Sequence, residues 1–227
     1  DQLSRPASRD LVQGIIAGGM VDDALADFIV ARTEGNPLFI EELISSLLES
    51  GSIRKEGELY RLALNPSDIQ VPATIQGIIA ARLDRLEGRL KGIMQTASVI
   101  GREFAFRILQ AVSSLKEDLN SALLSLQDLE LIYEKNIFPE LEYIFKHALT
   151  QEVAYNSLLI KKRKETHARV GQAIELLYAD RLEEFYEMLA YHYSMSENSG
   201  QAVQYLMRSG DKAARNYANW EALRFSE

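Results

Sequence analysis

The placement of proline constrains the fold of this chain more than any other feature. All five prolines lie within the first 139 residues, and residues 140–227 contain none. The same stretch has only three glycines, Gly171, Gly200 and Gly210. Apolar residues recur there at helical spacing, and proline and glycine are the residues that oppose helix formation most strongly. We therefore expect helices packed on helices toward the C-terminus and a more mixed structure before it.

The composition is that of a folded protein. Of 227 residues, 47% are hydrophobic and 26% are charged, which is not the profile of a disordered chain. No apolar run reaches the roughly 18 residues that a membrane span needs. The absence of cysteine excludes disulfides, thiol catalysis and cysteine zinc sites, and we expect a cytoplasmic protein. The chain has no initiator methionine and no signal-peptide pattern, so we expect a piece of a longer protein.

Residues 1–51 are expected to be helical. An amphipathic helix over 21–33 is broken at Gly35, and Asn36 then caps a second helix with Pro37 at its first position. On physical grounds alone this is an ordinary junction between two helices. A glycine that permits close approach, a rigid proline and a helix N-terminus are also the groups that could hold a purine nucleotide.

Residues 52–66 change to the period of a short β-hairpin. Residues 67–160 then contain short helices followed by a second hairpin, which is the order of a winged-helix domain. Ser114–Glu117 has the pattern of a capping box for the helix ahead of that hairpin, and His147 lies just beyond the hairpin. The expected helices cover 72–86, 90–100, 104–112 and 116–130. The expected strands of the second hairpin cover 131–133 and 141–145.

Residues 161–227 are expected to form a helical repeat. Tyr186 and Trp220 are separated by 34 residues, and so are Leu189 and Leu223. This separation is the period of tetratricopeptide (TPR) repeats, which stack as pairs of helices. We predict a TPR-like region whose array is truncated at the end of the chain.

No motif for catalysis is present. The sequence contains no P-loop and no nucleophile motif, and His147, His167 and His192 are far apart along the chain. We therefore predict no catalytic residue and no metal site. Glu41-Glu42 and Glu183-Glu184 are expected to lie on solvated helix faces.

DNA binding is not expected. The net charge is −8, and the candidate recognition helix over 116–130 has no lysine or arginine after Lys116. A recognition helix needs donors for the base edges and positive charge near the phosphates. The one basic run, Lys161–Lys164, is interpreted as a solvated helix face.

Four strings resemble segments of one family. Residues 33–43 (TEGNPLFIEEL) resemble a segment of the STAND-class signalling ATPases, which are related to AAA+ ATPases. Three later strings agree in order and spacing: VPATIQ with IAARLDRL over 71–86, FKHAL with QE and AY over 145–155, and YL, GD, AA and YA over 205–218. Together they resemble the bacterial members that are fused to adenylate or guanylate cyclases.

The resemblance implies a layout and a site. Residues 1–51 would be the helical lid, 52–66 a hairpin linker, 67–160 the winged helix and 161–227 the start of the TPR array. Gly35 and Pro37 would lie against the adenine, Asn36 would belong to the same nucleotide site, and His147 would contact the phosphates of ADP in the resting state.

The resemblance also implies partners outside this chain. The P-loop, the ATP or ADP and its Mg²⁺ would belong to a nucleotide-binding domain upstream, so this segment would be a regulator and not an enzyme. A protein or small-molecule inducer would bind the TPR region, and an effector such as a cyclase would receive the signal. The alternatives are a DNA-binding winged-helix regulator and a TPR scaffold for protein interaction.

Overall fold

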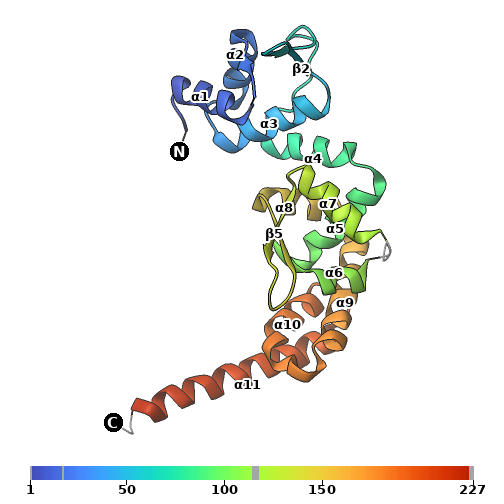
Figure 1. The fold of residues 1–227 in the computed structure, drawn as a ribbon. Coiled ribbons are helices and arrows are strands. Elements are labelled where there is room, and N and C mark those ends of the chain that lie inside the picture. Colours follow the sequence, from blue (N-terminus) through green and yellow to red (C-terminus); the bar gives the residue numbers. More distant parts are fainter. Residues whose placement is uncertain (1, 17, 114–117, 225–227) are drawn as a thin grey trace. The chain divides into compact units, whose positions relative to one another are not determined.

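The computed structural model describes residues 2–16, 18–113 and 118–224, with side chains up to residue 215. The chain divides into two compact units, Asp1–Arg85 and Leu86–Glu227, each treated separately below. The fold is mainly helical with small sheets, as expected (Figure 1). The predicted capping box, Ser114–Glu117, lies outside the described residues.

The first unit combines helices with a three-stranded sheet. The hairpin expected between residues 52 and 66 is confirmed, and its two strands are antiparallel. A two-residue strand too short to be predicted pairs parallel with the second hairpin strand. The elements of this unit are α1 (Arg5–Ile15), β1 (Met20–Val21), α2 (Asp23–Thr33), α3 (Pro37–Glu49), β2 (Ile53–Glu56), β3 (Leu59–Leu62) and α4 (Ile75–Arg85).

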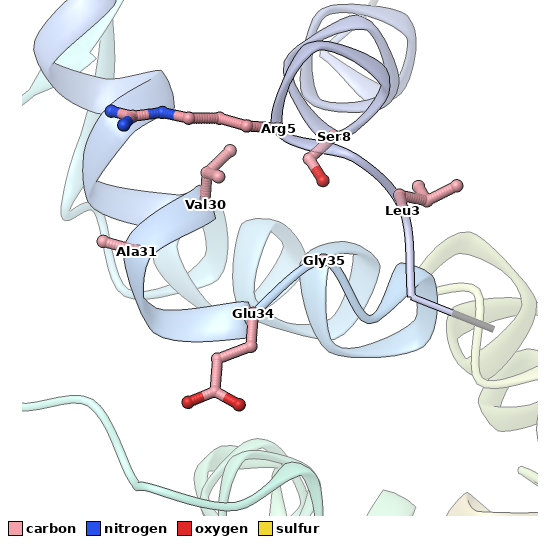
Figure 2. Close-up of a pocket in the computed structure, with 7 residues that line it drawn as sticks. All are labelled: Leu3, Arg5, Ser8, Val30, Ala31, Glu34 and Gly35. Carbon is pink, nitrogen blue, oxygen red and sulfur yellow. The ribbon is translucent and has the colours of Figure 1, made fainter.

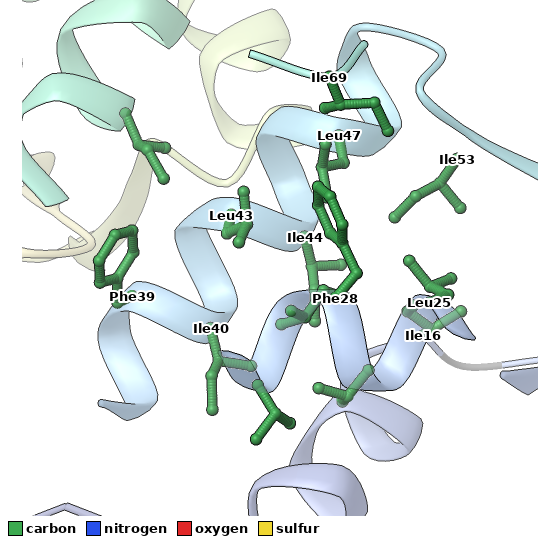
Figure 3. Close-up of a cluster of buried hydrophobic side chains, with 14 residues drawn as sticks. Ile16, Leu25, Phe28, Phe39, Ile40, Leu43, Ile44, Leu47, Ile53 and Ile69 are labelled. Carbon is green, nitrogen blue, oxygen red and sulfur yellow. The ribbon is translucent and has the colours of Figure 1, made fainter. Parts of the chain in front are cut away.

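A hydrophobic cluster holds this unit together (Figure 3). Leu25 and Ile29 of α2, and Ile40 and Ile44 of α3, have no exposed surface. Burying one such side chain contributes about 1.5–3 kcal/mol. The cluster therefore fixes α2 against α3, and with them the Glu34–Pro37 junction that connects the two helices.

The second unit begins as a winged helix. Its elements run α5 (Gly88–Ile100), β4 (Glu103–Ala105), α6 (Phe106–Val112), α7 (Leu119–Asp128), β5 (Ile132–Asn136) and β6 (Glu142–Phe145). The sheet order is β4-β6-β5, all antiparallel. The helix expected over 104–112 starts at Phe106 instead, because Glu103–Ala105 pairs with β6 as a strand that periodicity did not reveal.

Helices complete the second unit, as the missing prolines predict. They are α8 (Ala148–Asn156), α9 (Ile160–Leu177), a 3₁₀ segment (Ala179–Phe185), α10 (Tyr186–Ser194) and α11 (Ser199–Arg224). Leu189, one of the residues that mark the expected period, is buried, and so are Tyr193 of α10 and Ala202 of α11, whereas Leu206 of α11 is 57% exposed. The TPR period stays a prediction, because nothing is described of the side chains at 220 and 223.

Among the described residues, no helix has the length and hydropathy of a membrane span.

Candidate functional site

The junction between α2 and α3 has the local structure that its sequence dictates. Glu34 and Gly35 both adopt left-handed backbone conformations, with φ of 49° and 74°. The Asn36 side chain accepts a hydrogen bond from the Phe39 amide at 3.2 Å, which caps α3 as predicted. Pro37 begins the helix and is exposed. The motif therefore presents a rigid apolar ring beside an N-terminus with positive dipole.

Gly35 is buried because the chain's own N-terminal segment lies against it. The Leu3 amide donates to the Gly35 carbonyl at 2.8 Å. A Cβ atom on Gly35 would collide with the Leu3 carbonyl oxygen. On this side of the glycine, the close approach that could admit a ligand is therefore made by Leu3.

A pocket of about 300 Å³ opens beside the junction (Figure 2). Its lining comes from the N-terminal segment, α1, α2 and the junction: Leu3, Arg5, Ser8, Val30, Ala31, Glu34 and Gly35. The Glu34 carboxylate points away from α1 in Figure 2, so it does not close the pocket.

Arg5 borders this pocket and holds α1 to α2. Its guanidinium donates to the Asp27 carboxylate at 2.8 Å. This hydrogen bond is the main cause that lowers the pKa of Asp27, with the nearby charge of Arg9 acting in the same direction. The positive charge at the pocket rim is thus partly neutralised.

His147 occupies the N-cap position of α8, directly after the wing. Its carbonyl accepts from the Thr150 amide at 3.1 Å, while its side chain makes no cap hydrogen bond. The residue is half-buried. Its position just past the hairpin is as predicted, and it lies in the second unit, whereas Gly35, Asn36 and Pro37 lie in the first.

The structure brings together two histidines that the sequence separates by 25 positions. His167 of α9 and His192 of α10 have no exposed surface, and their Nδ1 atoms are 2.9 Å apart. His167 Nε2 lies 3.1 Å from the hydroxyl oxygen of Tyr155 in α8. Sequence analysis missed this cluster, because its only signal was a polar residue on the apolar face of each helix.

Glu42 corrects one prediction. Glu41-Glu42 was expected on a solvated helix face, but Glu42 is only 3% exposed. Its carboxylate accepts from Arg82 of α4 at 2.5 Å, and Arg82 is 4% exposed. Glu49 accepts from the same guanidinium, so one arginine joins two turns of α3 to α4. This network links α3 to α4.

The other residues expected on solvated faces are exposed only in part, since Glu41, Arg163 and Lys164 are half-buried. The side chains of Glu183 and Glu184 are 55% and 62% exposed. In the basic run, Lys161 and Lys162 are exposed and Lys164 lies 3.5 Å from Glu197. Among the described residues, no three histidine, aspartate or glutamate side chains gather as metal ligands.

Two comparisons with known proteins give matches. Residues 4–59 match a family described as a domain of unknown function (DUF8739), and this region contains the whole α2–α3 junction. An uncharacterized protein of Rhizobium meliloti (strain 1021) is 28% identical over 144 residues. The match covers 62% of this chain but only 13% of that protein, so the chain corresponds to a small part of a much longer relative.

Proposed function

We propose that this chain is a non-catalytic regulatory segment of a nucleotide-switched signalling ATPase. It would couple the nucleotide state of an upstream domain, and partners bound on its C-terminal helices, to an effector such as a nucleotide cyclase. The α2–α3 junction carries the proposal, because it presents Pro37 at an exposed helix N-terminus beside an open pocket. The great length of the relative fits a segment that works within a multidomain protein.

The winged helix supplies the second contact in this scheme. His147 follows the wing and begins α8, where an imidazole can donate a hydrogen bond to a phosphate oxygen. With ADP bound, both units would fold back on the nucleotide-binding domain, and exchange for ATP would release them. Such a switch needs a ligand that binds the two states with different affinity. We place this machinery in the cytoplasm.

The experiment is ADP dissociation from the longest natural protein that contains this chain, followed with a fluorescent ADP. Pro37→Ala and His147→Ala are expected to speed dissociation by about tenfold, the effect of losing one contact of roughly 1.4 kcal/mol. Pro6→Ala is the matched control, because Pro6 also opens an exposed helix start. Off-rates equal to that of the control in both variants would reject the proposal.

DNA binding remains the alternative, but the described helix α7 argues against it. The segment Leu119–Asp128 contains no lysine or arginine. A gel shift at low salt distinguishes DNA binding from the proposed nucleotide switch, because protein binding to nucleic-acid phosphates is strongest at low salt.

A further inference from the structure

A second pocket, of about 320 Å³, lies between α5 and α9 within the second unit. Its described lining contains three cations and no carboxylate. The cations are Arg89, Lys162 and Arg169, and hydrogen-bonding groups come from Gln95, Thr96 and Thr166. A concave site with this charge favours an anion.

Helical spacing places these groups on facing surfaces. Lys162, Thr166 and Arg169 are one and two turns apart on α9, so they lie along one face. The Arg169 guanidinium donates to the Val112 carbonyl, which holds this cation at the end of α6. The Thr166 hydroxyl donates to the Lys162 carbonyl at 2.8 Å. The α9 wall is therefore ordered by contacts within the protein.

The α5 wall contains an unusual glycine. Gly92 lies inside the helix, where glycine costs about 1 kcal/mol relative to alanine. A Cβ atom there would meet nothing within 4 Å, so close packing does not require glycine. What glycine does at this position is leave the pocket open. A Cβ atom on Gly88 would likewise meet nothing within 4 Å. Gly88 begins α5, so the positive end of the helix dipole adds to the charge of the three cations.

Nearby carboxylates neutralise this charge only weakly. Arg89 lies 3.6 Å from Glu87 and 3.6 Å from Asp118, and Lys162 lies 4.0 Å from Glu165. Each of these acidic side chains is at least half exposed, and exposed ion pairs contribute about 0–1 kcal/mol. None of the three lines the pocket.

We propose that this pocket binds a small molecule through its phosphate groups. Two guanidinium groups match phosphate geometry, a lysine adds a point charge, and a helix N-terminus is a ready anion site. The pocket volume of about 320 Å³ suits a phosphorylated metabolite or an inorganic polyphosphate. The inference does not depend on the proposed function, because the lining of this pocket includes neither His147 nor any residue of the α2–α3 junction.

The test is titration calorimetry of the full chain with pyrophosphate at constant ionic strength. Saturable binding of one pyrophosphate per chain is expected, with sulfate binding more weakly because it carries less charge. Lys162→Gln should weaken binding by about tenfold or more, the usual value of a charge-assisted contact. Lys161→Gln, which removes the same charge from the neighbouring position, should leave the affinity unchanged.

Gly92→Glu provides a second test, at a position where an added Cβ atom meets nothing within 4 Å. Glutamate is a better helix former than glycine and its Cβ atom has room here, so the melting temperature should not fall. Its carboxylate would occupy the pocket and abolish pyrophosphate binding, whereas Gly92→Gln, of the same size without the charge, should bind more tightly than Gly92→Glu. Absence of saturable binding by the wild-type chain, equal losses in Lys161→Gln and Lys162→Gln, or undiminished binding by Gly92→Glu would each overturn the proposal.

Discussion

The Nδ1 atoms of His167 and His192 lie 2.9 Å apart in the interior of the second unit. At this distance one nitrogen donates a proton and the other must accept it, so both rings cannot be charged. Burial, followed by the charge of Arg163, lowers the pKa of His167 from 6.5 to about 4. Burial, followed by the proximity of His167, lowers the pKa of His192 to about 3. The hydrogen bond between the rings is lost when both imidazoles are protonated, and burial favours the state in which both are neutral.

Acid is therefore expected to destabilise the second unit. In the unfolded chain each imidazole takes up a proton near pH 6.5, but in the folded chain only near pH 4 or below. The contribution of the neutral histidine pair to the free energy of unfolding is complete above pH 6.5. It declines as the pH falls toward 4, because the unfolded state then binds more protons than the folded state. Between pH 7.5 and 5 the free energy of unfolding should fall by about 2–4 kcal/mol. Urea unfolding at the two pH values measures this loss.

A double variant isolates the histidine pair from other acid effects. His167→Gln with His192→Leu removes both buried titrating groups and should flatten the stability profile over this pH range. His147→Gln is the control, and it should keep the full pH dependence. A double variant as acid-sensitive as the wild-type chain would assign the effect to other groups.

Removing Arg82 should strongly destabilise the first unit. Arg82→Ala leaves Glu42 buried without its partner, a change that costs about 3–5 kcal/mol. Arg85→Ala, which removes an arginine whose side chain is 40% exposed one turn away, should cost about 1 kcal/mol or less. The urea midpoints of Arg82→Ala and Arg85→Ala measure the two losses of stability. Equal midpoints would contradict a structural role for the buried pair of Arg82 and Glu42.

Gly35→Ala should destabilise the first unit by about 1–3 kcal/mol, since it places a side chain at positive φ and against the Leu3 carbonyl. Gly14→Ala is the comparison, because Gly14 is helical and has no neighbours within 4 Å. That variant should be neutral or slightly more stable. Melting temperatures distinguish the two, and a Gly35→Ala protein as stable as wild type would show that the Leu3 segment is not held there.

The cap of α3 can be tested by one pair of substitutions. Asn36→Ala removes the acceptor for the Phe39 amide and should cost about 1 kcal/mol. Asn36→Asp keeps an acceptor and adds charge that favours the helix N-terminus, so it should preserve or raise stability. If chemical denaturation places both variants at the same midpoint, the hydrogen bond does not contribute.

Local chemistry explains which elements were predictable. Asn36 with Pro37 favours the start of a helix, and Gly101 favours the end of one. The structure places the start of α3 and the end of α5 at these residues. The hairpin β2–β3 follows from its turn around Gly57. Strands β1 and β4 escaped prediction because two or three residues carry too little pattern, and only their pairing partners make them strands.

The candidate pockets show the same division. Gly35, Asn36 and Pro37 are consecutive, so their arrangement depends on backbone rules that the sequence expresses directly. Arg89 and Lys162 approach one pocket only because α5 packs against α9.

The sequence by itself determined that this chain is largely helical, roughly where the helices between residues 21 and 130 lie, and that a hairpin closes the winged helix. Those properties depend on contacts within a few residues and on the spacing of apolar side chains. The tertiary structure alone decided that His167 meets His192, that Glu42 is buried against Arg82, and that Leu3 covers Gly35. Each of these contacts joins residues at least 25 positions apart, and helix packing brings such residues together without leaving a local signal.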